Sequence, residues 1–179
     1  FRQDAVKNRY ADWDELIGYC ELSANPVGRY LMDLHGEDKA LWAPSDALCT
    51  VLQILNHLQD LQPDIENMDR VYLPLNMLAQ VHQSVDALHG AAMSDGLREV
   101  VDVCLDRCDA MIAEAEKRPS RLRSRRLNAE MRVITALARR LSARLRRQDP
   151  LATRVKLSKP DFTMAAFAGM RGLLERAAT

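Results

Sequence analysis

The chain has 179 residues, 25 basic and 25 acidic side chains, and 47% hydrophobic residues. These values fit one globular domain with a buried core, and they exclude a low-complexity or disordered chain. Every apolar run is interrupted after a few residues, which excludes a membrane-spanning helix.

Charge is unevenly distributed along the chain. Residues 1–116 contain 8 Lys or Arg against 21 Asp or Glu, and residues 117–179 contain 17 against 4. The two parts should attract each other, and the basic part could cover an anion or touch a membrane surface. No signal peptide opens the chain, and the four cysteines lack the spacing of a metal or disulfide framework. We therefore expect reduced core cysteines and a cytoplasmic protein, with the inner membrane surface as a place of peripheral contact.

The first predicted helix begins after Asp12, a residue type that caps helices. Asn25-Pro26 then interrupts the helix, because proline lacks a backbone N–H and disfavours helical geometry in the preceding residue. Gly28 removes side-chain volume close to this break. Two interpretations remain open: a junction between two helices, or a gap through which a bulky apolar ligand approaches the backbone.

The next predicted helix runs from about Asp46 to Leu61, with Ser45 as its N-cap. It carries a polar row whose members are three or four residues apart and therefore share one helix face. Carboxylate and amide oxygens suit Mg²⁺, which completes its shell with water and phosphate. Alternatively, such a row is solvated surface. The polar row comprises Gln53, Asn56, Asp60 and Asp64, while Leu52, Leu55 and Leu58 are expected to face the core.

Four neighbouring residues bear on this site. Pro63 is unfavourable inside a helix, so we expect a kink or an end near Asp64 and regard Asp60 as the stronger ligand. His57 adjoins the polar row in sequence but is expected on another helix face. Arg70 and Tyr72 follow in a short loop and could contact a phosphate.

Helical spacing of apolar residues continues to the end of the chain, and no segment alternates with the period of a strand. We predict an all-α protein with roughly seven helices. Lys117–Arg147 contains twelve basic residues, without the interleaved aromatic residues that stack on single-stranded nucleic acid, so no nucleic-acid partner is expected. An apolar stripe from Leu127 to Leu145 favours a core helix with a solvated basic face. A last amphipathic helix, capped by Ser158, contains Phe162, Phe167, Met170, Leu173 and Leu174.

Two motifs resemble the squalene/phytoene synthase family. One is QILNHLQDLQPDIENMDRVYLP at residues 53–74, and the other is YCxxSANPVGR at residues 19–29. The spellings HLQDL and DRVYLPL are most similar to the hydroxysqualene synthases of hopanoid biosynthesis, and the resemblance extends from Phe1 to about Lys159. It implies an isoprenoid-synthase-type helical bundle. It also implies that residues 1–179 form the C-terminal part of a longer domain, lacking the N-terminal helices and their first aspartate-rich motif.

The resemblance further implies roles for individual residues. Asn56, Asp60 and Asp64 would be catalytic and would hold Mg²⁺, and Lys156 or Lys159 could approach the diphosphate. The other implied positions bind an isoprenoid diphosphate substrate: Tyr19, Ala24, Val27 and Gly28 on its apolar part, and Gln53, Arg70 and Tyr72 on its diphosphate.

The implied reaction converts presqualene diphosphate and water to hydroxysqualene and diphosphate. The chain contains no GxG, which mildly disfavours a reductive squalene synthase. One alternative is the condensation of two prenyl diphosphates to presqualene diphosphate or phytoene. Another is an inactive homologue that acts as a structural or assembly partner. Without the upstream motif, residues 1–179 alone are expected to be inactive.

Overall fold

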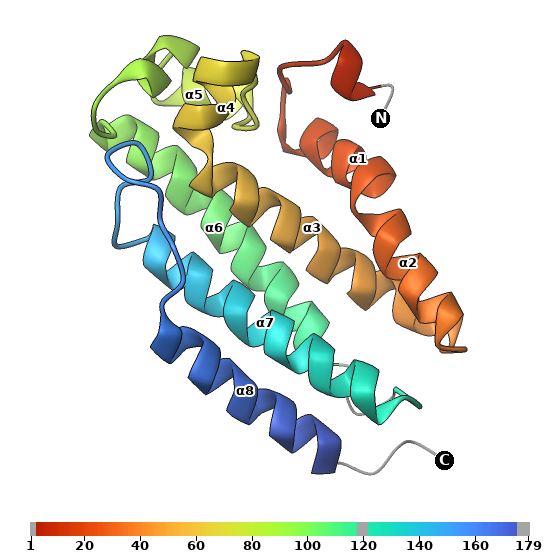
Figure 1. Ribbon diagram of the computed structural model, residues 1–179. Coiled ribbons are helices and arrows are strands. Elements are labelled where there is room, and N and C mark those ends of the chain that lie inside the picture. The colour runs from red at the N-terminus through yellow and green to blue at the C-terminus, as the bar shows by residue number, and fades with distance from the viewer. Residues whose placement is uncertain (1–2, 118–121, 175–179) are drawn as a thin grey trace.

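Helices dominate residues 3–117 and 122–174, which are the parts of the chain that the computed structural model describes (Figure 1). No strand is present in these parts, and the all-α prediction is confirmed. The α-helices are α1 (Trp13–Ser23), α2 (Asn25–Leu34), α3 (Trp42–Gln59), α4 (Leu61–Met68), α5 (Leu75–Gln80), α6 (Asp95–Glu116), α7 (Arg125–Leu145) and α8 (Lys159–Leu174). Three short 3₁₀ helices cover Gln3–Ala5, Lys39–Leu41 and Val85–His89.

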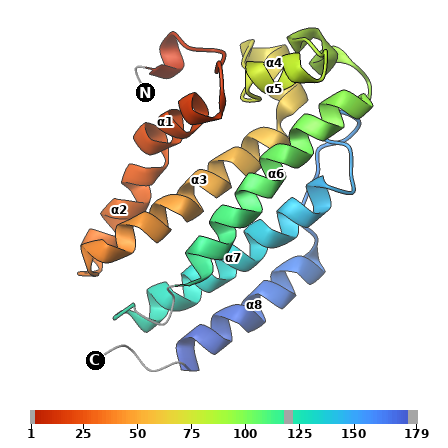
Figure 2. The same ribbon diagram turned by 180° about the vertical axis from the view of Figure 1, so that it is seen from behind.

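The long helices α3, α6 and α7 lie side by side, as both views show (Figures 1 and 2). α1 and α2 pack beside α3 on one side of these three helices, and α8 packs beside α7 on the other side. The short helices α4 and α5 lie at the end of the bundle where α3 finishes, and the loop between α7 and α8 returns to that same end. Residues far apart in sequence can therefore meet there. None of the described helices combines the length and the apolar content needed to cross a bilayer.

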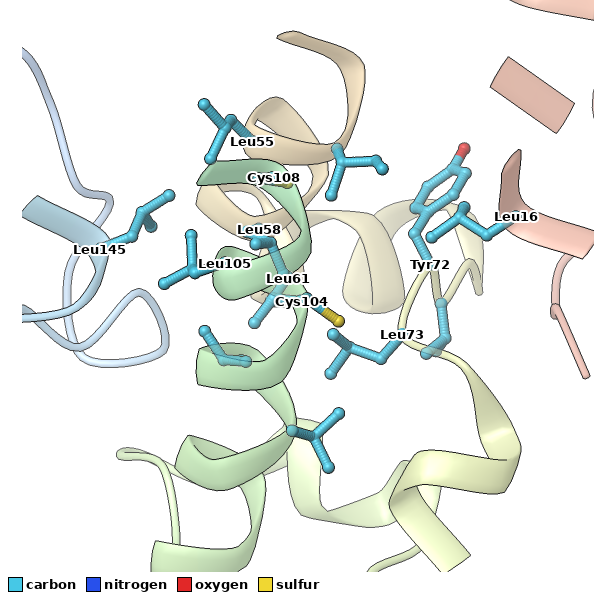
Figure 3. Close-up of a cluster of buried hydrophobic side chains, with 14 of the residues drawn as sticks. Leu16, Leu55, Leu58, Leu61, Tyr72, Leu73, Cys104, Leu105, Cys108 and Leu145 are labelled. Atoms are coloured by element: carbon cyan, nitrogen blue, oxygen red, sulfur yellow. The ribbon is translucent and has the colours of Figure 1, made fainter. Parts of the chain in front are cut away.

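The core lies between α3 and α6, and it is closed by the segment after α4 and the end of α7 (Figure 3). Cys20, Cys104 and Cys108 are free and buried within it, as the sequence predicted. Burial raises the pKa of Cys20 and of Cys104 to about 12, so both thiols stay protonated at neutral pH. They pack as small apolar side chains rather than as nucleophiles or ligands.

The junction between α1 and α2 confirms the predicted break. Asp12 caps α1 by accepting a hydrogen bond from the amide of Glu15, and α2 begins at Asn25 with proline next in its first turn. A Cβ atom built on Gly28 would lie 2.5 Å from the Sγ atom of Cys49 and 2.5 Å from the Oγ atom of Ser45. α3 therefore fills the space expected beside Gly28, and the glycine allows two helices to pack closely.

Three expectations about α3 were wrong. The helix begins at Trp42, so Ser45 is a buried interior residue and not an N-cap. It ends at Gln59, and Pro63 lies in the first turn of α4, where the missing N–H costs no helical hydrogen bond. The break thus falls at Asp60 and not at Pro63. Leu52 is 38% exposed, in contrast to the buried Leu55 and Leu58.

The basic helix α7 buries the apolar stripe that its sequence predicted, apart from Ile134, which is 37% exposed. The basic side of this helix is not wholly solvated as expected. Arg140 and Arg144 form ion pairs with the buried carboxylate of Asp161 on α8. That carboxylate also accepts a hydrogen bond from the backbone amide of Ser158, and this contact closes the first turn of α8.

Candidate functional site

The polar row does not continue along one helix. Its first two members lie on α3, where Gln53 is half-buried and Asn56 is exposed. The Ser23 hydroxyl lies 2.8 Å from the side-chain oxygen of Gln53 and 2.8 Å from the carbonyl oxygen of Tyr19. Gln53 is therefore tied to the end of α1, beside the helix break.

Asp60 lies between α3 and α4 and holds an arginine that the sequence analysis missed. Arg154 donates from Nε to one carboxylate oxygen at 2.6 Å and from Nη2 to the other at 2.9 Å. The Asp60 side chain is only 17% exposed, whereas Arg154 is 49% exposed. The Gln59 side chain donates to the carbonyl oxygen of Val155, which holds the same loop against the end of α3. A bidentate pair of this kind fixes both side chains in one geometry.

Asp64 lies on α4 and is buried against His57 of α3. The Oδ2 atom of Asp64 is 3.6 Å from His57 Nδ1. The imidazole stacks on the ring of Tyr72, with the centroids 3.4 Å apart and the planes at 9°. The expectation that His57 stays apart from the polar row was therefore wrong at Asp64, because the change of direction at Asp60 turns α4 toward His57.

Aromatic side chains surround this contact. The Tyr72 ring centroid lies 5.6 Å from that of Tyr10 and 5.8 Å from that of Tyr19, and all three tyrosines are buried. The structure thus brings Tyr19 and Tyr72 together with Asp64, although these residues come from three different segments. Tyr10 carries no signal in the sequence motifs that would have indicated it.

Three of the remaining predicted residues differ in their exposure. Arg70 is half-buried and follows the left-handed residue Asp69, which ends α4. Ala24 is half-buried between α1 and α2, and Val27 is 60% exposed on α2. The ligand and substrate roles assigned to these residues remain predictions.

The donor set fits a cation with few protein ligands. Within residues 3–117 and 122–174, no three His, Cys, Asp or Glu side chains are grouped closely enough to hold a metal. Mg²⁺ needs no such group, because it commonly binds one or two carboxylates and completes its shell with water and phosphate. The hydrogen bonds that Arg154 donates to Asp60, together with the negative charges of Asp60 and Asp64, raise the pKa of Arg154. Asp60 thus neutralises an arginine in this structure, and the assignment of Asp60 and Asp64 as Mg²⁺ ligands stays a prediction.

The sequence of this chain is similar to those of known enzymes. The family model for squalene/phytoene synthase matches residues 1–161. Hydroxysqualene synthase of Rhodopseudomonas palustris is 39% identical over 98% of this chain and 60% of that protein. The enzyme of the same name from Zymomonas mobilis is 36% identical over 97% of this chain and 59% of that protein. Several phytoene synthases are 30 to 34% identical over 49 to 69% of the chain.

The fold has a solved counterpart. The crystal structure of squalene synthase HpnC from Alicyclobacillus acidocaldarius superposes with a TM-score of 0.77 and 33% identity, over 82% of this chain and 56% of that one. The chain therefore spans about 60% of the length of the relatives that it matches. The match of sequence over nearly the whole chain, together with the shared helical fold, shows that this chain belongs to the squalene/phytoene synthase family.

Proposed function

We propose that the intact protein converts presqualene diphosphate and water to hydroxysqualene and diphosphate. One observation carries this choice within the family. The relatives named hydroxysqualene synthase match 95 to 98% of the chain at 36 to 39% identity, whereas the phytoene synthases match at most 69% of it. The likeness to the first group includes the segments that pack around Asp60 and Asp64.

The difficult step is the breaking of a carbon–oxygen bond, which leaves a carbocation and a diphosphate anion. Bound Mg²⁺ would supply charge neutralisation for the departing diphosphate. Asp60 and Asp64 would hold the cation, and the exposed amide of Asn56 would add an oxygen or hydrogen-bond one of its waters. Because Arg154 is already fixed at Asp60, it would place a second positive group where the diphosphate charge collects.

The apolar surroundings would protect the carbocation from bulk water. Tyr10, Tyr19 and Tyr72 are packed against one another beside Asp64, and the backbone of Tyr19 is linked through Ser23 to Gln53. A wall of this kind excludes most water from one side of the site. Attack of one positioned water on the carbocation, with loss of a proton to the departed diphosphate, would then yield the alcohol.

Product analysis tests the proposal. The intact protein is incubated with presqualene diphosphate and Mg²⁺ in ¹⁸O-labelled water, and we expect the label in a tertiary alcohol detected by mass spectrometry. Formation of squalene alone would refute the reaction.

A second candidate, the condensation of two prenyl diphosphates, is favoured by the matches to phytoene synthases. Incubation with farnesyl diphosphate tests it in parallel, since turnover there combined with no turnover of presqualene diphosphate would select condensation. Failure of both reactions, with no rise of the melting temperature on adding Mg²⁺ and diphosphate, would identify an inactive homologue.

A further inference from the structure

Ser23, the last residue of α1, connects the polar row to the aromatic side chains of the candidate site. Its Oγ atom lies 2.8 Å from the side-chain oxygen of Gln53, which shares one face of α3 with Asn56. The same Oγ atom lies 2.8 Å from the carbonyl oxygen of Tyr19, whose ring centroid is 5.8 Å from that of Tyr72. One half-buried hydroxyl is thus bonded between a polar residue and the backbone of an aromatic one.

The helix break that follows Ser23 is held firmly against α3 (Figure 1). Thr50 of α3 donates a hydrogen bond from Oγ1 to the side-chain oxygen of Asn25 at 3.0 Å, and both side chains are buried. Gly28 of α2 packs closely on the same helix. The backbone on both sides of the break is therefore anchored, and Ser23 is fixed in place by its neighbours as well as by its own two contacts.

The hydrogen-bonding capacity of Ser23 limits what it can bind. A hydroxyl has one proton and two lone pairs. The proton goes to one of the two oxygens at 2.8 Å, and both of these belong to the protein. Toward a ligand, Ser23 is therefore an acceptor. It has no proton left for an oxygen of diphosphate, and an isoprenoid chain has no O–H or N–H to donate. Among the reactants of the proposed reaction, only water can donate a hydrogen bond to it.

We infer that Ser23 positions the water that captures the carbocation, an inference that rests on the proposed function. The bond between carbon and the diphosphate oxygen breaks, and its electron pair leaves with the diphosphate. The water donates one hydrogen to Ser23 Oγ, so its own lone pair is left to form the new carbon–oxygen bond. The proton released from the attacking water passes to the diphosphate. Ser23 acts through this water and is a positioning residue.

This role makes Ser23 a determinant of the product. A carbocation that meets no positioned water loses a proton from a neighbouring carbon to the diphosphate instead, and the electrons of that carbon–hydrogen bond form a carbon–carbon double bond. The product is then a hydrocarbon and not an alcohol. Because the buried rings of Tyr19 and Tyr72 exclude most other water, the ratio of alcohol to hydrocarbon should depend on the acceptor at Ser23.

Product ratios of the intact protein test the inference, with presqualene diphosphate and Mg²⁺ in ¹⁸O-labelled water. Ser23→Ala removes the acceptor, and the ratio of labelled alcohol to hydrocarbon should fall on the order of tenfold, as for the loss of one hydrogen bond to a reacting group. Ser23→Thr keeps a hydroxyl and should restore the ratio. A purely structural role would not change this ratio, since partial unfolding reduces both products in the same proportion.

Thr163→Ala is the matched control. Thr163 also lies 3.1 Å from the carbonyl oxygen of the residue four positions earlier in its helix, but it is exposed on α8. Its product ratio should equal that of the unmodified protein, and a fall equal to that of Ser23→Ala would overturn the inference. An unchanged ratio in Ser23→Ala would also overturn it, while labelled alcohol from the unmodified protein would leave the proposed reaction standing. Absence of labelled alcohol from the unmodified protein would overturn both.

Discussion

At the scale of single residues, Asp60 is the side chain on which the proposed chemistry depends most. Asp60→Asn keeps the shape but removes the charge that holds Arg154 and, in our proposal, Mg²⁺. We expect kcat/KM to fall on the order of 100-fold or more, as for the loss of one electrostatic stabiliser. The rise in melting temperature produced by Mg²⁺ and diphosphate should shrink as well.

Asp106→Asn is the matched control for Asp60→Asn. Asp106 also pairs with an arginine, Arg146, but it is exposed on α6 and has no part in the proposed site. The kcat/KM of the Asp106→Asn variant should stay within about twofold of that of the unmodified protein, since exposed ion pairs contribute little. Full activity in Asp60→Asn would remove Asp60 from the mechanism even though the family is established.

His57 should matter more for stability than for activity. Its half-buried ring packs on Tyr72, so His57→Ala should lower the free energy of unfolding by about 2 kcal/mol and the melting temperature by about 4 to 8 °C. The loss of kcat/KM should be smaller than for Asp60→Asn. His57→Phe should restore much of the stability, because a stacked ring is retained. Equal losses of kcat/KM in His57→Ala and Asp60→Asn would instead give His57 a part in the chemistry.

The residues of the site could be predicted only where they are close in sequence. Helical spacing correctly placed Gln53 and Asn56 on one helix, but that helix ends at Gln59, just before Asp60. The site roles given to these residues and to Tyr72 stay predictions. Arg154 could not be paired with Asp60, because 94 residues separate them and no spacing pattern links a loop to a distant helix end. The contact exists because the loop after α7 returns to the end of α3 (Figure 1).

At the scale of helices, close packing of α2 on α3 makes a specific prediction about Gly28. Gly28→Ala places a Cβ atom 2.5 Å from Cys49 Sγ and from Ser45 Oγ, so we expect a loss of about 1 to 3 kcal/mol. Gly18→Ala is the control, because nothing lies within 4 Å of its added Cβ atom in α1. That change should stabilise the protein by about 0.5 to 1 kcal/mol. Thermal unfolding measures both changes, and a neutral Gly28→Ala would contradict the tight contact.

The attachment of α8 to α7 should depend on pH through Asp161. Hydrogen bonds from Ser158, Arg144 and Arg140 hold the pKa of this carboxyl well below its usual range. Because the folded state then binds the proton more weakly than the unfolded state, the stabilisation is present above the unfolded pKa of about 4 and is lost as the pH falls through the lowered pKa.

Asp161→Asn measures this dependence. Its melting temperature should lie below that of the unmodified protein at pH 7, and the difference should narrow as the pH is lowered from about 5 to about 3. The control is Glu99→Gln, which removes an exposed carboxylate on α6 and should show no such trend. A difference that stays constant over this range would mean that the charge of Asp161 does not hold α8.

The presence of the helices could be predicted from the sequence. For some helices, the face that points to solvent could not. The sequence correctly predicted the cap at Asp12, the helix break at Pro26 and the buried stripe of α7, because each depends on residues that are close in sequence. In α8 the sequence offers one stripe of large apolar residues and another of Ala and Gly. The second stripe faces α7, because small residues allow the backbones to approach and Asp161 to reach its arginines. Only the neighbouring helix decides between two such stripes.

At the scale of the whole molecule, the acidic and basic halves are joined by ion pairs across the bundle. Arg139 pairs with Glu116 at 2.7 Å, while Arg146 lies 2.7 Å from Asp106 and 2.8 Å from Asp109. Together with the pair of Arg154 and Asp60, these contacts connect the basic part of the chain to α6 and to the end of α3. Each pair is partly exposed and contributes on the order of 0.2 to 1 kcal/mol to the stability of the fold. All of the pairs hold the basic part of the chain against the acidic part.

This arrangement predicts that salt destabilises the protein. Raising NaCl from about 0.05 to 0.5 M shortens the screening length to a few ångströms and should lower the melting temperature by about 2 to 6 °C. Arg139→Gln with Arg146→Gln should reduce that dependence, because these arginines join the two halves. Arg126→Gln should not, because Arg126 pairs with Glu130 inside the same basic helix. A melting temperature that rises with NaCl would show that repulsion within each half outweighs the attraction between them.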